Sequence, residues 1–324
     1  MIDRPTLFIL GAGASKPYGY LTGAELRADI IKNFSNYFQK LENITPAASR
    51  DIKKFVDTFS KSSLISIDRY LSLNPATAQG GKMGITLSIL NSEKNSSFRE
   101  DIEDPNEDWY TYLFNRMMDG LNKRDDYKKF SENKVAFITF NYDKSLEYIL
   151  YESFYHSFYQ NRQDIEKNIE NLISFPIIHV YGTVDEFKTL EWPGHNYRKD
   201  FKDFFSIENL SKGIMVIGEE RAGESIKEQI KKLLPNYKRI FFLGFGYAKE
   251  NLDAIDFAKN VSHKTFVYGT AKGMTKKEIK DISGYFPIIP GETYYIQETE
   301  ESIDTTFRPT IKDINCLELL REYL

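Results

Sequence analysis

The sequence predicts an α/β protein with a doubly wound, mostly parallel sheet and a helical insert. Short apolar runs rich in β-branched and aromatic residues recur along the chain and are typical of buried strands. Segments with helical spacing separate most of these runs, and such alternation indicates a parallel sheet with helices on both faces. The first run, Thr6–Leu10, opens directly into the turn Gly11-Ala12-Gly13.

The composition is that of a globular chain, with 324 residues, 41% hydrophobic and 28% charged. The net charge of −4 argues against direct nucleic-acid binding. The single cysteine, Cys316, excludes a disulfide within the chain and a zinc site built on several thiolates. We therefore expect no metal and no zinc ribbon. Without a secretory leader or a long uncharged apolar run, we expect a cytoplasmic protein without a membrane segment.

The first strand is followed by a helical third of the chain. Thr22 and Glu25 have the spacing of a capping box, which predicts the start of a helix. Apolar residues three and four apart predict helices over residues 24–38, 51–59, 65–73, 86–90 and 107–121. The polar stretch 91–106 is predicted to be a mobile loop suited to a lid. We therefore expect an α/β domain, residues 1–40 and 134–324, and a helical insert, residues 41–133.

The rest of the chain alternates strands with helices. Buried strands are predicted over residues 135–140, 177–180, 214–217, 240–243 and 265–268. A helix should begin near Asp143, with an aromatic face formed by Tyr148, Tyr151, Phe154, Tyr155, Phe158 and Tyr159. Such a face is most often core, and part of it could instead be an oligomer contact. After about residue 285, one strand and a closing helix complete the predicted fold.

The glycine turn after the first strand favours a nucleotide ligand over a hydride-transfer cofactor site. A strand followed by Gly-x-Gly can present backbone N–H groups to phosphates, and glycine allows close approach of a pyrophosphate. The dehydrogenase fingerprint, however, needs a third glycine where Lys16 stands and an acidic residue about 20 residues later. Neither is present. A plain tight turn is the alternative interpretation.

Ligands of parallel sheets lie beyond the carboxyl ends of the strands, so the residues there carry most of the functional information. The later strand ends are Asn141-Tyr142-Asp143, Tyr181-Gly182-Thr183, Gly218-Glu219 and Gly244-Phe245-Gly246-Tyr247. Together with Gly11 and Gly13 they predict a backbone-lined crevice for a phosphate-rich ligand. The structural alternatives are an Asx-turn at Asn141, a helix N-cap at Asp143 and a satisfied core histidine at His179.

Four motifs carry a family resemblance: F-I-L-G-A-G-A-S at residues 8–15, T-F-N-Y-D at 139–143, I-H-V-Y-G at 178–182 and L-G-F-G at 243–246. In this order they resemble the nucleotide-binding motifs of sirtuins, and more closely those of sirtuin-like NAD hydrolase domains of bacterial antiphage defence. The resemblance covers residues 5–40 and 134–270 and implies a Rossmann-type NAD-binding domain. The zinc ribbon of sirtuin deacylases has no counterpart here, because the chain has one cysteine.

The resemblance also implies roles for individual residues. Ala12, Gly13 and Ser15 would contact the phosphates and nicotinamide ribose of NAD, Asn141 and Asp143 would line the nicotinamide pocket, and His179 would be the catalytic base. Gly244 and Gly246 would approach the adenosine side, and the turns of Gly11 and Gly182 would complete the cofactor site.

The expected reaction is hydrolysis of NAD to nicotinamide and ADP-ribose. Nicotinamide leaves as a neutral group, so an amide and an imidazole that orient and deprotonate water would suffice. Two alternatives stay open: a sensor that binds NAD or ADP-ribose without cleaving it, and a zinc-free deacylase or ADP-ribosyltransferase.

An active NAD hydrolase would deplete its own cell, so its activity must be controlled. We expect abortive-infection defence, with control by homo-oligomerisation or by a partner protein in trans such as an ATPase or an Argonaute-like subunit.

Overall fold

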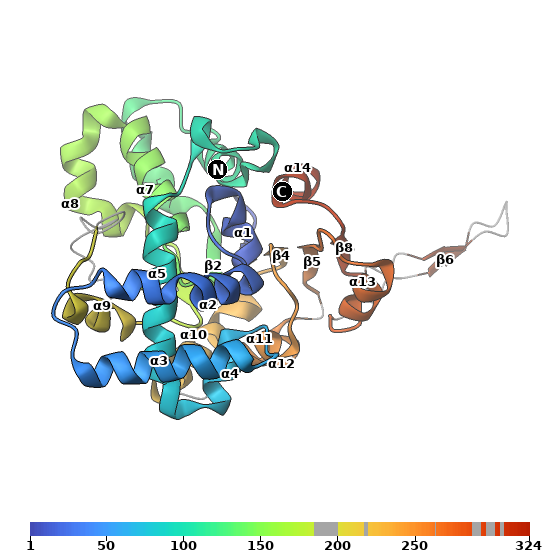
Figure 1. The fold of residues 1–324 in the computed structure, drawn as a ribbon. Helices are drawn as coiled ribbons and strands as arrows, with labels where there is room; N and C mark the ends of the chain where they lie inside the picture. The colour runs from blue at the N-terminus through green and yellow to red at the C-terminus, as the bar shows by residue number, and fades with distance from the viewer. Residues whose placement is uncertain (185–199, 217–219, 263, 287–292, 296–301, 305–307) are drawn as a thin grey trace.

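The structure is a computed structural model that describes residues 1–184, 200–216, 220–262, 264–286, 293–295, 302–304 and 308–324 (Figure 1). Among these residues, six strands form one sheet in the order β3-β2-β1-β4-β5-β8. These strands are β1 (Thr6–Leu10), β2 (Val135–Thr139), β3 (Ile177–His179), β4 (Arg239–Leu243), β5 (Phe266–Thr270) and β8 (Thr310–Lys312). All five pairings are parallel. The predicted α/β fold with a parallel sheet is therefore confirmed.

The strand order places a topological switch point at the centre of the sheet. The chain moves from β1 outward to β2 and β3, then returns to β4 on the other side of β1. This is the order of doubly wound dinucleotide-binding sheets, in which a crevice opens where the direction reverses. In this protein that crevice lies between the carboxyl ends of β1 and β4.

Helices occupy the connections between the strands. Before β2 these are α1 (Ala12–Ser15), α2 (Gly23–Gln39), α3 (Pro46–Lys61), α4 (Ile67–Leu73), α5 (Ala78–Lys94) and α6 (Trp109–Met118). After β2 they are α7 (Ser145–Ser157), α8 (Arg162–Leu172), α9 (Phe204–Ser211), α10 (Glu220–Leu233), α11 (Lys249–Ala254), α12 (Phe257–Asn260), α13 (Lys276–Ser283) and α14 (Cys316–Tyr323).

Short 3-10 helices complete the connections. They are η1 (Lys16–Tyr18), η2 (Pro75–Thr77), η3 (Arg99–Asp101), η4 (Pro105–Glu107), η5 (Arg124–Glu132), η6 (Tyr159–Asn161) and η7 (Leu234–Asn236).

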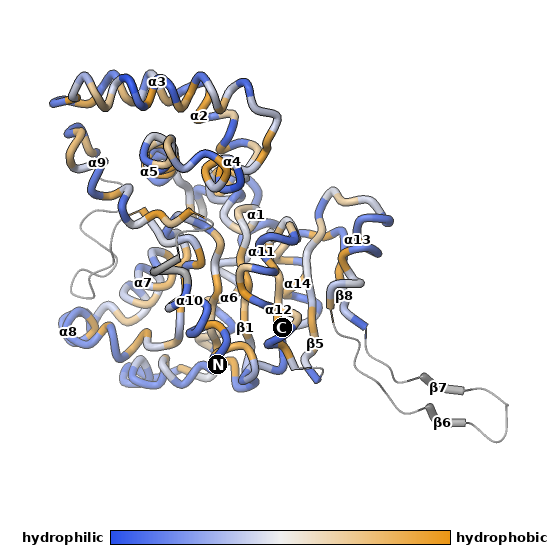
Figure 2. Tube along the Cα trace, turned by 90° about the horizontal axis from the view of Figure 1, so that it is seen from below, coloured by the Kyte–Doolittle hydropathy of each residue, from blue (hydrophilic) through white to orange (hydrophobic). Residues whose placement is uncertain are grey.

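Both faces of the sheet are buried, because alternate side chains of each strand enter two different cores. Leu7 and Ile9 of β1 belong to a core shared with α2, α3, α5 and α9. Phe8 and Leu10 belong to the other core, with α6, α7, α8 and α14. Figure 2 shows the apolar strands at the centre of the molecule, with α2, α3, α4, α5 and α9 gathered on one side of them.

Three sequence predictions about elements differ from the structure. Residues 214–216 form no regular strand: Ile214 makes one isolated bridge with Gly182, and residue 217 lies outside the described residues. The predicted loop 91–106 begins later than expected, because α5 continues to Lys94, and its Phe98 stacks on Tyr18 with ring centroids 5.3 Å apart. Two further strands, β6 (Thr293–Tyr295) and β7 (Ser302–Asp304), pair with each other before β8.

The aromatic face of α7 is mostly core, as predicted. Phe154 is buried, and Tyr148, Tyr151 and Tyr155 pack partly buried against the same core. The helix is shorter than predicted, because α7 ends at Ser157, and Phe158, which follows it, is also buried. Tyr159 is exposed. An oligomer contact on this face stays a prediction.

Candidate functional site

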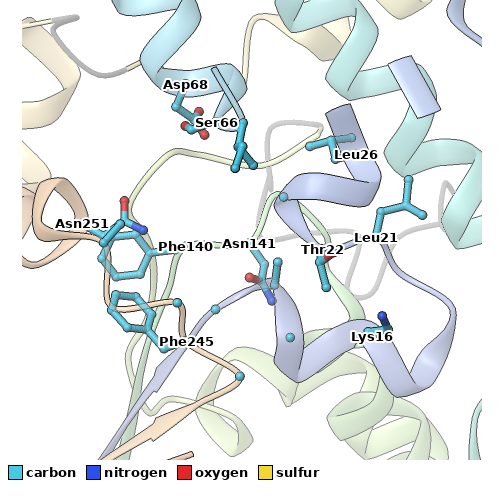
Figure 3. Close-up of a pocket in the computed structure, with 18 of the residues that line it drawn as sticks. Lys16, Leu21, Thr22, Leu26, Ser66, Asp68, Phe140, Asn141, Phe245 and Asn251 are labelled. Atoms are coloured by element: carbon cyan, nitrogen blue, oxygen red, sulfur yellow. The ribbon is translucent and has the colours of Figure 1, made fainter. Parts of the chain in front are cut away.

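A cavity of about 1110 Å³ opens at the carboxyl ends of the central strands. Its lining includes Gly11–Gly13 after β1, Phe140–Asp143 after β2, Tyr181 after β3, Gly244–Gly246 after β4 and Thr270 at the end of β5. Residues 63–69, which include the first turn of α4, line the side opposite the strand ends (Figure 3). With strands about 4.8 Å apart, the stretch from β2 to β5 is about 14 Å wide. The cavity therefore suits an elongated ligand.

The predicted glycines after β1 and β4 bring two loops into direct backbone contact. The Gly13 N–H donates to the Gly244 carbonyl at 2.9 Å, and the Gly11 N–H donates to the Leu243 carbonyl at 3.0 Å. A Cβ on Gly11 would lie 2.6 Å from the Gly244 oxygen, and one on Gly244, whose φ is +56°, would lie 1.9 Å from the Ala14 nitrogen. These glycines are needed for loop packing, and the Gly11 and Gly13 N–H groups are already occupied.

Asn141 lies at the floor of the cavity with its orientation fixed by three hydrogen bonds. Its side-chain Nδ2 donates to Ser15 Oγ at 2.9 Å, and its backbone N–H donates to Thr139 Oγ1 at 3.1 Å. Its backbone carbonyl is 3.0 Å from His179 Nδ1. The remaining polar atom, Oδ1, is buried and has no hydrogen-bond partner among the described residues. A buried acceptor without a partner is costly, so Oδ1 is an atom that a ligand or a water would satisfy, as is Oε2 of the nearby Glu147.

Asp143 lines the cavity and belongs to a polar network with Ser15. Ser15 is fully buried and does not line the cavity. The Asp143 carboxylate accepts from the Ser145 N–H at 3.0 Å and from Ser15 Oγ at 3.3 Å, and Tyr110 Oη lies 2.7 Å from Ser145 Oγ. Burial raises the pKa of Asp143 above its usual range. The N-cap of α7 is Lys144 rather than Asp143.

His179 is buried beside the cavity rather than in its lining. Its Nε2 lies 2.6 Å from Glu147 Oε1, and its Nδ1 faces the Asn141 carbonyl. Burial by itself would lower the pKa of His179, but the charge and hydrogen bond of Glu147 raise it above the ordinary value. The structure thus brings His179 next to Asn141 through the backbone and gives both ring nitrogens protein partners.

The remaining predicted residues fall in different places. Ala12 and Gly246 line the cavity, and a Cβ on Gly246 would meet nothing within 4 Å. Gly182 does not line it; its φ is +67°, and a Cβ there would lie 1.9 Å from the Gly213 carbonyl oxygen. The predicted strand end Gly218-Glu219 lies outside the described residues.

Several lining residues had no predicted role, although Tyr142, Tyr181 and Phe245 were expected at the strand ends. Tyr181 follows β3, lines the cavity, and donates from its hydroxyl to Asn251 Oδ1 at 2.7 Å. Tyr142 donates to the carboxylate of Asp68, which burial leaves with a raised pKa. Phe140 and Phe245 meet edge to face with centroids 5.1 Å apart, and Figure 3 shows both rings at one side of the cavity.

Glu147 also escaped prediction, although the sequence holds a signal for it. It is a carboxylate one helical turn before Leu150 and two before Phe154, both buried, and an acidic residue on an apolar helix stripe needs a buried partner.

Each cation that lines the cavity is paired with a carboxylate among the described residues. Lys16 pairs with Glu25 at 2.7 Å, and Arg69 pairs with Glu250 at 3.3 Å. Lys272 pairs with Glu107. All three cations are more than half exposed, so these pairs are weak and can exchange partners with an anionic ligand.

Within the described residues, no group of three or more His, Cys, Asp or Glu side chains could hold a metal ion. None of the described helices combines the length and the apolar character needed to cross a membrane. No protein-family model and no curated protein matches this chain.

Proposed function

We propose that the cavity binds NAD and hydrolyses the bond between nicotinamide and ribose, releasing nicotinamide and ADP-ribose. The observation that carries the proposal is the Asn141 side chain, held by Ser15 with its buried Oδ1 left free at the cavity floor. The switch point of the parallel sheet supports a dinucleotide, because such ligands lie across that crevice. The cavity volume of about 1110 Å³ is ample for a ligand of this size.

The chemistry requires orientation more than acid–base strength. The C1′–N bond breaks with its electron pair moving to the nicotinamide nitrogen, which turns a cationic pyridinium into a neutral leaving group. Water then adds to C1′ of the oxocarbenium-like ribose, and its proton passes to solvent. Asn141 Oδ1 would accept a hydrogen bond from this water or from a ribose hydroxyl and hold it in line with C1′.

The finer features of the proposal follow from the chemistry and from the resemblance to sirtuin-like domains. The enzyme would work without a zinc ribbon, with the helices of residues 41–133 as an insert that covers the cavity. A cytoplasmic NAD hydrolase of this kind would serve abortive-infection defence by depleting NAD. It would be held inactive until a homo-oligomer or a partner in trans, an ATPase or an Argonaute-like subunit, assembles with it.

A second candidate function is binding of NAD or ADP-ribose without cleavage. The position of His179 favours it, because the expected base has both ring nitrogens occupied and does not line the cavity. A sensor would need the cavity and Asn141 but no base.

The proposal is tested by nicotinamide release from NAD, with no acceptor added, by the wild type, Asn141→Ala and Asn115→Ala. Asn115 is exposed on α6 and serves as the matched control. We expect Asn141→Ala to lower kcat by about a hundredfold or more, the usual loss when a transition-state contact is removed, while Asn115→Ala stays at the wild-type rate.

ADP-ribose binding by calorimetry separates the two candidates. Release by the wild type at any protein concentration supports hydrolysis. Full activity of Asn141→Ala would contradict the assigned role, and tight ADP-ribose binding without release would favour the sensor.

A further inference from the structure

A buried histidine–glutamate pair, His179 and Glu147, lies beside Asn141. His179 and Glu147 have side chains only 10% and 6% exposed, and Nε2 and Oε1 are 2.6 Å apart. His179 is the last residue of β3 and Glu147 lies in the first turn of α7, so the pair connects the end of a strand to the start of a helix. Breaking such a pair by removing one partner leaves an uncompensated buried group.

With Glu147 ionised, the two partners of His179 determine where the protons of the ring lie. The Asn141 carbonyl and the Glu147 carboxylate are both hydrogen-bond acceptors, and an imidazole that faces two acceptors donates from both nitrogens. Neither nitrogen then has a lone pair to accept a proton from water or ribose. The ring in this arrangement is a donor to Asn141 and cannot be its base.

Asn141 depends on this donation. Its Nδ2, backbone N–H and backbone carbonyl are held by Ser15, Thr139 and His179 respectively, which leaves Oδ1 as the one polar atom of Asn141 without a partner among the described residues. A small rotation of this residue would move Oδ1 away from the cavity, and misplacements of about 1 Å can cost a hundredfold in rate.

We propose that Glu147 and His179 are positioning residues: Glu147 keeps the imidazole doubly protonated, and His179 Nδ1–H holds the Asn141 carbonyl so that Oδ1 faces the reacting ribose. The inference rests on the proposed NAD hydrolysis and replaces a base at His179 with a donor. It also assigns a role to Glu147, which the reaction otherwise leaves without one.

The pH dependence of kcat distinguishes a donor from a base. Since the His179 pKa is raised in the folded protein, a required imidazolium is retained at low pH and lost as pH rises through that pKa. A required base has the opposite sign, with activity lost as pH falls. The charged and titratable groups near the ring are Glu147, Asp143 and, through them, Tyr110. Titration of Asp143 would change kcat on the acid side of the pH profile. Only the loss of kcat on the alkaline side, the alkaline limb, therefore reports on His179.

His179→Gln provides the decisive variant. Glutamine can donate a hydrogen bond to the Asn141 carbonyl but cannot take up a proton from water. For a positioning role we expect His179→Gln to keep kcat within about tenfold of wild type and to lose the alkaline limb. His179→Ala should lose about a hundredfold with little change in KM. Equal losses of about 10²–10⁴ in both variants, with an acid limb in the wild type that the variants lack, would overturn the proposal in favour of a base.

Glu147→Gln tests the counterion. The glutamine amide carries no charge, so the pKa of His179 should fall. We therefore expect the alkaline limb of the kcat profile to lie at lower pH than in the wild type. An unmoved limb would overturn the role of Glu147.

A spectroscopic readout keeps this inference separate from the hydrolysis proposal. In protein with ¹⁵N-labelled histidine, long-range ¹H–¹⁵N spectra report the protonation of each ring nitrogen, and His179→Gln identifies the His179 signals. We expect both nitrogens to be protonated at neutral pH and the signals to shift towards the neutral ring in Glu147→Gln. A bare Nε2 at neutral pH would overturn the inference even in an active enzyme, whereas protonated nitrogens in a protein that releases no nicotinamide would refute hydrolysis alone.

Discussion

At the scale of the residue, the contact between the β1 and β4 loops leaves room for main-chain atoms only. Gly244 has a left-handed φ of +56°, and its α-carbon hydrogen points at the Ala14 nitrogen, where a Cβ would lie 1.9 Å away. Two residues later, Gly246 lines the same cavity with open space where a Cβ would project. The same role at the ligand site was expected for both glycines, but Gly244 is required for loop packing and Gly246 is not.

We predict that Gly244→Ala destabilises the fold by about 3 kcal/mol or more, because steric overlap with main chain adds to the cost of a left-handed alanine. Gly246→Ala should change the free energy of unfolding by less than about 0.5 kcal/mol. Urea denaturation followed by circular dichroism measures both. Equal stability of the two variants would contradict the role given to Gly244, and weaker NAD binding by Gly246→Ala alone would indicate close ligand approach there.

The sequence could identify Asn141 as a strand-end polar residue, because its motif and its place in the strand–helix alternation are local properties. It could not identify the bonds to Ser15 and His179, since these join residues 126 and 38 positions away. It also could not show that Tyr181, and not His179, lines the cavity. His179 ends β3 and Tyr181 comes two residues later, and nothing in this short segment of sequence distinguishes which side chain faces the cavity.

At the scale of the element, α4 is tied to two other parts of the cavity wall. The Asp68 carboxylate accepts from Tyr142 in the loop after β2, and Arg69 pairs with Glu250 of α11. Ser66 caps the helix by accepting from the Arg69 N–H at 3.2 Å. These contacts hold residues 63–69 across the cavity from Asn141 (Figure 3).

We predict that Asp68→Asn stabilises the protein at pH 7. Burial raises the pKa of Asp68 in the folded state, so its stability contribution is present at low pH and is lost as pH rises through the folded pKa. Asparagine keeps an acceptor for Tyr142 without the partly buried charge. The gain in the free energy of unfolding should vanish as the pH falls below the unfolded pKa of about 3.9.

The control is Asp57→Asn, at an exposed ion pair with Lys61, which should change the free energy of unfolding by less than about 0.5 kcal/mol. A gain that grows on acidification would refute the assignment.

Strands with strong β-branched and aromatic content were predictable, as β1, β2 and β4 show. The segment 214–216 has the same apolar character, but Ile214 and Val216 are buried against neighbouring helices without a ladder of hydrogen bonds. Short apolar runs do not distinguish these two outcomes. The polar composition of residues 91–106 concealed the buried Phe98 and Ile102, because packing against Tyr18 is a long-range contact.

At the scale of the whole molecule, the helices of residues 41–133 share their core with the sheet. Phe55 of α3 is fully buried, and its ring lies 6.2 Å from that of Phe34 in α2, 5.5 Å from Phe59 and 6.1 Å from Tyr70. The same apolar cluster contains Leu7 and Ile9 of β1. Continuous burial of this kind couples the unfolding of the two regions, because neither can open without exposing the shared surface.

We predict that Phe55→Ala lowers the free energy of unfolding by about 3–5 kcal/mol and accelerates hydrogen exchange in β1 as well as in α3. Leu73→Ala, at a side chain that is 65% exposed, should alter neither by more than about 0.5 kcal/mol. Urea denaturation and exchange mass spectrometry provide the two measurements. Faster exchange confined to α3–α5, with β1 unchanged, would mean that residues 41–133 open independently of the sheet. Faster exchange in both regions would mean that the wall opposite Asn141 is only as stable as the strands that carry the site.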